Sequence, residues 1–144
     1  MSMNETMGKI LIALPVFFSA SAIIDYSTTI WFSGSKENLI QNEFSPLLVY
    51  AVKNDMVIPY VFFTVIFYFF TSYLALKMLT SDEKIFYCAS AILALISLAH
   101  TFGGLSWYFK SEAYSNAILA ISAIAVMMAI FLSGWTFLRK KNTV

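Results

Sequence analysis

The chain has 144 residues, of which 60% are hydrophobic and 12% are charged, and its formal net charge is +1. A soluble domain usually carries about 25% charged residues, and a short one buries only about two-thirds of its unfolded surface. The apolar excess must therefore face lipid, and the near-zero charge gives no basic field for nucleic acid. The single cysteine, Cys88, excludes an internal disulfide, and its apolar surroundings predict a small buried hydrophobe.

Four stretches are long and apolar enough to cross a bilayer, which takes about 20 mostly apolar residues per helix. They are residues 10–32, 56–78, 85–109 and 117–138. Their length and lack of strict alternation exclude transmembrane β-strands. The sequence therefore predicts an all-α integral membrane protein, a four-transmembrane-helix bundle that forms a single domain over residues 1–144.

The first stretch also has features of a secretory signal, because Lys9 precedes the apolar run ILIALPVFF and the small residues SASA. The apolar run continues beyond SASA through Ile23 and Ile24 to Phe32. This continuation favours a retained membrane span over a cleaved signal.

The connection between the first two spans, residues 33–55, is the longest of the three. Within it, residues 44–52 read FSPLLVYAV, which is apolar but too short to span a bilayer. Ser45 followed by Pro46 is typical of a helix start, with a capping hydroxyl before a proline at the first helical position. We expect a short helix over about 45–53 that either lies at the membrane interface or re-enters the membrane. The other two connections are tight, which predicts antiparallel neighbours.

Basic residues in the flanks predict the orientation, because cytoplasmic loops carry an excess of Lys and Arg. The side that holds both termini carries Lys9, Lys77, Lys84, Arg139, Lys140 and Lys141, and the other side carries Lys36, Lys53 and Lys110. This asymmetry predicts a multi-pass protein of the cell membrane with both termini in the cytoplasm.

Asp25 is the most informative residue of the first span. A carboxylate in the hydrocarbon costs roughly 2.5–3.5 kcal/mol on insertion scales, so such residues face the bundle interior and have partners. Ser21, Thr28 and Thr29 lie three or four positions from Asp25 and therefore share its helical face. The first helix is predicted to present this polar stripe inward.

His100 is the other ionisable residue deep in a span. The first and third spans run in the same direction, and a rise of about 1.5 Å per residue places Asp25 and His100 at similar depth, roughly 10–14 Å from the same edge. Gly103 and Gly104 follow His100 and would let a neighbouring backbone come close. We therefore expect a hydrogen bond or ion pair between Asp25 and His100.

Glu43 precedes the expected Ser45–Pro46 helix start, where the helix dipole stabilises a carboxylate by about 0.3–1 kcal/mol. If the loop folds over the bundle, Glu43 joins Asp25 and His100, a set that could bind a divalent metal or relay protons. The competing interpretation is a structural polar clamp, since no HExxH-type spacing supports a metal site. The sequence names no cofactor and no catalytic residue, and its lack of a GxSxG turn argues against a hydrolase.

The order of these motifs resembles a family of small prokaryotic membrane proteins catalogued as domain of unknown function 5658. The resemblance covers about residues 10–100 and rests on the D-x-x-T pattern from Asp25 to Thr28, on Glu43-Phe-Ser-Pro-Leu47, and on His100. This chain differs in having Ser45 where the family usually has asparagine, and in its additional fourth span. The resemblance implies a polar site at these residues but no activity, because the family has none established.

Three functions remain open from the sequence. The first is a binding or transport-like module whose intramembrane site contains Asp25, His100 and Glu43. The second is an accessory or scaffold subunit of a larger membrane complex, in which the aromatic second helix and the small-residue fourth helix contact other subunits or a second copy. The third, and the least supported, is a membrane-embedded enzyme.

Overall fold

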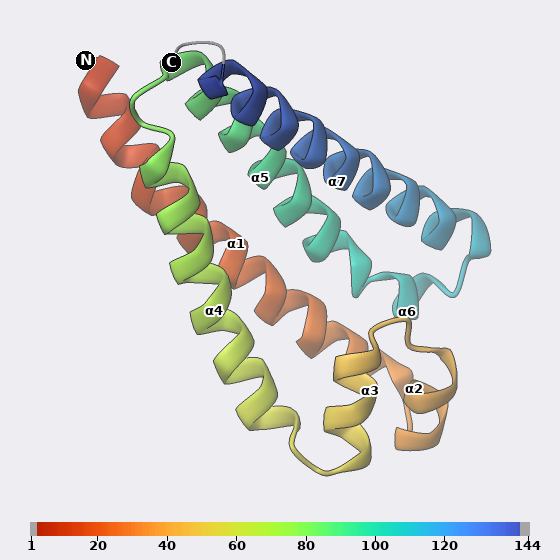
Figure 1. The fold of residues 1–144 in the computed structure, drawn as a ribbon. Coiled ribbons are helices and arrows are strands. Elements are labelled where there is room, and N and C mark those ends of the chain that lie inside the picture. The colour runs from red at the N-terminus through yellow and green to blue at the C-terminus, as the bar shows by residue number, and fades with distance from the viewer. Residues whose placement is uncertain (1–2, 142–144) are drawn as a thin grey trace.

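A computed structural model describes residues 3–141, and every regular element in this range is a helix (Figure 1). The helices are α1 (Met3–Ser33), α2 (Lys36–Asn42), α3 (Pro46–Lys53), α4 (Val57–Met78), α5 (Glu83–Gly103), α6 (Ser106–Phe109) and α7 (Glu112–Lys141). Of these, 4 give segments that are long and apolar enough to cross a membrane, namely Glu5–Ser33, Val57–Met78, Glu83–Phe109 and Glu112–Thr136. The predicted all-α bundle of four membrane-spanning helices, with a short helix in the first long loop, is confirmed. The chain is a polytopic membrane protein.

The four long helices are arranged in the order α4, α1, α5, α7. Helix α1 packs along both α4 and α5, and α7 packs along α5. Helices α1 and α5 run in one direction and α4 and α7 in the other, so the start of α1 and the end of α7 lie at one end, which we call the terminal end (Figure 1). Helices α2, α3 and α6 lie at the opposite end, which we call the loop end.

The tight turn between α4 and α5 predicts that they are antiparallel neighbours. They are antiparallel, but they do not pack against each other along their length. Their contacts are few compared with those that each makes with α1. The cluster that joins them contains Leu76, Phe86 and Met7, one residue from each of the three helices, close to the turn. Over the rest of their length α1 lies between α4 and α5 and packs along both (Figure 1).

The loop end is built by local capping signals. Gly34, with a φ of 76°, ends α1 in a left-handed conformation that few other residues adopt. The Ser35 hydroxyl accepts a hydrogen bond from the Asn38 amide and starts α2, a helix that sequence inspection did not reveal. The Ser45 hydroxyl accepts from the Leu48 amide, with Pro46 beginning α3 as predicted.

A small hydrophobic cluster holds the α2–α3 hairpin against the long helices. Leu39 of α2 and Leu48 of α3 are almost fully buried with Tyr26 of α1, and Tyr60 of α4 packs against them. Fully burying a leucine side chain contributes roughly 1.5–3 kcal/mol. The hairpin is therefore attached to the bundle, and the chain between α2 and α3 is placed beside α1.

Small residues mark the contact of α5 with α1. Ser90, Ser97 and Gly104 recur at intervals of seven, and all three are buried. A Cβ atom added to Gly104 would collide with the Thr28 hydroxyl and with the Asp25 backbone of α1. The two helices can approach this closely only because residue 104 has no side chain, as is common where helices cross in membranes.

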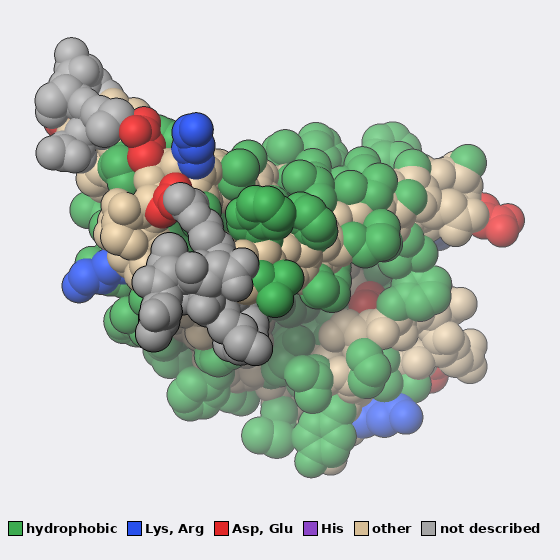
Figure 2. All heavy atoms as spheres, turned by 45° about the horizontal axis from the view of Figure 1, so that its top comes forward, with side chains coloured by type: hydrophobic (Ala, Val, Ile, Leu, Met, Phe, Trp, Pro, Cys, Tyr) green, Lys and Arg blue, Asp and Glu red, His purple; other side chains and the backbone are tan. Residues whose placement is uncertain are grey.

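The outer faces of the long helices are apolar, as Figure 2 shows for one side of the molecule. On α4, Phe62, Phe63 and Phe67 are each about 60% exposed or more, so the aromatic residues of this helix largely face outward. Cys88 is also exposed, and its predicted burial is wrong. Periodicity could not distinguish a protein-facing from a lipid-facing position, because both are apolar.

Candidate functional site

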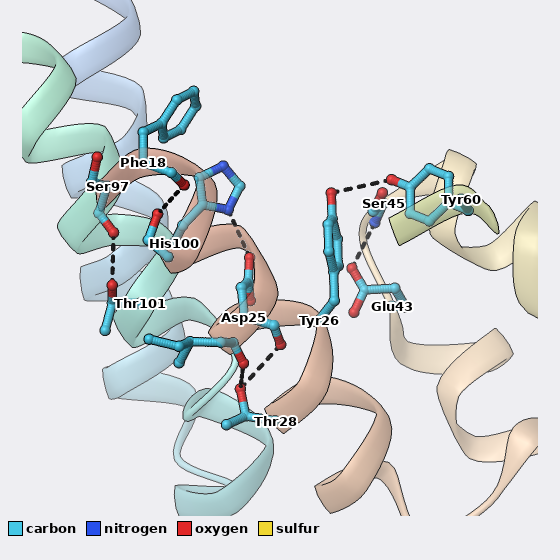
Figure 3. A network of polar contacts seen from close by, with 12 residues as sticks. Phe18, Asp25, Tyr26, Thr28, Glu43, Ser45, Tyr60, Ser97, His100 and Thr101 are labelled. Atoms are coloured by element: carbon cyan, nitrogen blue, oxygen red, sulfur yellow. Dashed lines mark hydrogen bonds and ion pairs between the residues drawn. The ribbon is translucent and has the colours of Figure 1, made fainter. Parts of the chain in front are cut away.

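The Asp25 and His100 side chains meet between α1 and α5. Asp25 Oδ2 lies 2.7 Å from His100 Nδ1, and Figure 3 shows the carboxylate directed at the imidazole ring. The side chain of Asp25 is 19% exposed and that of His100 is 25% exposed, so both are largely buried. The contact expected from their equal depth is confirmed.

Aromatic rings from two helices surround the imidazole. The ring centroids of Phe18 on α1 and Tyr68 on α4 lie 5.8 and 5.7 Å from that of His100. These two rings are themselves stacked at 4.5 Å with an interplanar angle of 2°. Both rings therefore lie beside the imidazole that bonds to Asp25.

The other polar residues of the predicted stripe bond mainly to their own helix. The Thr28 hydroxyl donates to the carbonyl oxygens of Ile24 and Asp25, and the Ser21 hydroxyl donates to that of Phe18. Such bonds to the preceding turn satisfy hydroxyl groups inside a membrane helix. Thr29 is 3% exposed, and it lines the pocket described next.

A pocket of about 510 Å³ opens beside the Asp25–His100 pair. Its lining comes from α1, α4, α5, α6 and α7, together with the chain around residues 43–48 at the loop end. Figure 2 shows the hollow between the long helices and the loop-end segment. Ligand sites typically measure roughly 300–1,000 Å³ and combine an apolar lining with a few polar groups, and this pocket fits both criteria.

Glu43 contributes a second carboxylate to the pocket lining. Its Oε1 accepts a hydrogen bond of 2.9 Å from the Ser45 amide (Figure 3). Burial raises the pKa of the Glu43 carboxyl above its ordinary value, and the charge of Asp25 raises this pKa further. Hydrogen bonds from Ser45, Trp107 and Phe44 partly lower this pKa again. The loop thus brings Glu43 into electrostatic contact with Asp25.

Sequence reasoning missed the aromatic lining of the pocket. Tyr26, Tyr60, Tyr68 and Trp107 all contribute to it. The Tyr26 and Tyr60 hydroxyls lie 3.2 Å apart and link α1 to the start of α4 (Figure 3). Tyr26 follows Asp25 directly, but one helical position turns a side chain by about 100°, so the pattern gave no sign that both would reach one cavity.

Among residues 3–141, no group of three or more His, Cys, Asp or Glu side chains is placed to hold a metal ion. This includes the set Asp25, Glu43 and His100 that the sequence suggested as metal candidates. The pocket brings the three residues to one cavity without converging them on one point.

Comparisons with protein-family models, with curated proteins and with solved structures found no match to this chain. The resemblance to domain of unknown function 5658 stays a prediction.

Proposed function

We propose that this membrane protein binds a small ligand in the pocket beside Asp25, His100 and Glu43. The observation that supports this most directly is the pocket itself, because a structural clamp between Asp25 and His100 would need no cavity next to it. Two helices and a loop each contribute one ionisable group to the same lining. Ionisable residues at membrane depth are costly and usually mark ion, proton or substrate sites.

Thermal unfolding in nanodiscs tests this proposal. The purified protein is melted with Na⁺, K⁺, Mg²⁺ and Ca²⁺, and with small organic cations, anions and alcohols. A compound at 100 times its dissociation constant stabilises the folded state by about 2.7 kcal/mol. We expect at least one class to raise the Tm of the wild type, and Asp25→Asn and His100→Gln to lose this rise.

Glu37→Gln is the matched control, because Glu37 is an exposed carboxylate of α2 at the same end of the molecule and outside the pocket lining. It should retain the full rise in Tm. The proposal fails if none of the compounds stabilises the wild type, or if the stabilisation survives both pocket substitutions in folded protein.

The alternative is an accessory subunit whose exposed helices contact other proteins or a second copy. The surface that would serve it includes Phe63 and Phe67 on α4 and Ile130 and Phe131 on α7, which are 62–73% exposed. Lipid covers such a surface equally well. A monomer that is stable and retains ligand-dependent stabilisation in nanodiscs would count against the subunit function.

We also propose that the protein lies in the cell membrane with both termini in the cytoplasm. The terminal end carries Lys9, Lys77 and Lys84 close to the helix ends, and α7 finishes there in its basic C-terminal segment. A green fluorescent protein fused to the C-terminus should fluoresce, and an alkaline phosphatase fusion at the same point should be inactive. The reverse pattern would refute this orientation.

A further inference from the structure

We infer that the pocket accepts an organic ammonium ion that carries an apolar group. This inference rests on the proposed function and names the class of ligand. It draws on the charges in the lining, on the aromatic rings and on the apolar rim of the pocket.

The charged groups of the lining favour a cation. The pocket residues include the carboxylates of Asp25 and Glu43, the imidazole of His100, and no Lys or Arg among those that line it. Asp25 is paired with His100. Among residues 5–136, whose side chains the structure describes, no Lys, Arg or His lies within ion-pair distance of the Glu43 carboxylate. A bound cation would supply the missing charge, whereas an anion would be repelled.

The aromatic lining favours an organic cation over a bare metal ion. Ammonium groups bind over the faces of Trp and Tyr rings, and Tyr26, Tyr60, Tyr68 and Trp107 all line the cavity. Trp107 also reaches Glu43, since its side chain contributes to the hydrogen bonding of that carboxylate. Among the described residues, no group of three or more His, Cys, Asp or Glu side chains is placed to hold a metal ion, so the lining favours Mg²⁺ or Ca²⁺ less than an organic cation.

The rim explains why the cation should carry an apolar group. Helices α4 and α7 both line the pocket, yet within residues 3–141 they have no extended packing against each other. The lining residues at this margin are exposed and apolar: Phe44 is 79% exposed, Leu47 68%, Leu119 46% and Val126 53%. The pocket therefore combines acidic and aromatic lining residues with exposed apolar ones. An amphiphilic cation matches both parts.

Three compounds of similar size and different charge test the inference. They are 2-phenylethylammonium, the neutral 2-phenylethanol and the anion 3-phenylpropanoate. Binding to the full-length protein is measured by ligand-observed NMR in phosphatidylcholine nanodiscs, with empty nanodiscs subtracted. We expect the ammonium compound to bind most tightly and the carboxylate not to bind. Because a hydrogen bond to a charged group is worth about 1.5–3 kcal/mol, Glu43→Gln should weaken ammonium binding about tenfold or more.

Trp107→Leu should also weaken ammonium binding and leave 2-phenylethanol binding nearly unchanged, whereas Glu37→Gln should change neither. Glu43→Gln keeps the shape and the amide-facing oxygen of the side chain, so it should fold even if Asp25→Asn does not. The ammonium inference is wrong if the alcohol or the carboxylate binds better than the ammonium compound. If substitution of Asp25 or Glu43 also abolishes that binding, the pocket is still a ligand site and the proposed function stands. If none of the three binds and the wider Tm screen is also negative, both this inference and the proposed function are wrong.

Discussion

Replacing Gly104 with alanine tests the closest approach of α1 and α5. Gly104 is buried and has helical backbone angles, a φ of −61° and a ψ of −28°, that alanine adopts without strain. The added methyl would nevertheless overlap with Thr28 Oγ1, the Asp25 carbonyl oxygen and the Asp25 Cα. Two of these atoms are backbone and cannot rotate away, so α5 must move away from α1.

Overpacking of this kind costs about 1–3 kcal/mol. This cost should exceed the stability of up to about 1 kcal/mol that alanine gains over glycine from its higher helix propensity. Gly104→Ala should therefore lower the free energy of unfolding, and it should lengthen the Asp25–His100 hydrogen bond next to the crossing. The measurement is unfolding in mixed micelles titrated with sodium dodecyl sulfate, followed by far-ultraviolet circular dichroism.

Gly134→Ala is the control, since a Cβ atom at Gly134 in α7 meets nothing within 4 Å. It should leave stability unchanged or raise it slightly. The Gly104→Ala, Thr28→Ala double variant should recover part of the loss, because one of the three overlaps is gone. The described crossing is wrong if Gly104→Ala is as stable as Gly134→Ala.

Two further predictions concern the pocket lining. Because burial raises the pKa of Glu43 above its ordinary value of 4.5, the folded protein retains a proton that the unfolded chain releases. The protonated Glu43 side chain contributes its full stability below pH 4.5, and this contribution should be lost as the pH rises through the raised pKa. The Glu43→Gln variant should not show this loss. Identical pH profiles of unfolding for the wild type and the variant would contradict the burial of Glu43. Tyr60→Phe removes one hydrogen-bond partner of the Tyr26 hydroxyl and should cost about 0.5–1.5 kcal/mol in the same unfolding assay. Tyr50→Phe, at a residue 63% exposed, should change stability by less than about 0.5 kcal/mol, and equal effects of the two substitutions would argue against the Tyr26–Tyr60 bond.

The sequence determined the membrane class, the number of spans and the equal depth of Asp25 and His100. These follow from terms that act along one helix. Apolar length decides which segments can cross a bilayer, and the rise per residue places Asp25 and His100 at one depth. The capping pair Ser45–Pro46 located the start of α3 for the same reason, since capping involves neighbouring backbone groups.

Only the tertiary structure decided which helices are neighbours and where the cavity lies. Hydropathy does not distinguish a lipid-facing apolar residue from a buried one, so neither the limited packing of α4 on α5 nor the exposure of Cys88 could be read from the chain. The pocket arises because α4 and α7 lie on opposite flanks of α1 and α5 and leave the space between them unfilled. Glu43 reaches this space through the packing of Leu39 and Leu48 against α1 and α4, contacts between residues distant in sequence that no local pattern encodes.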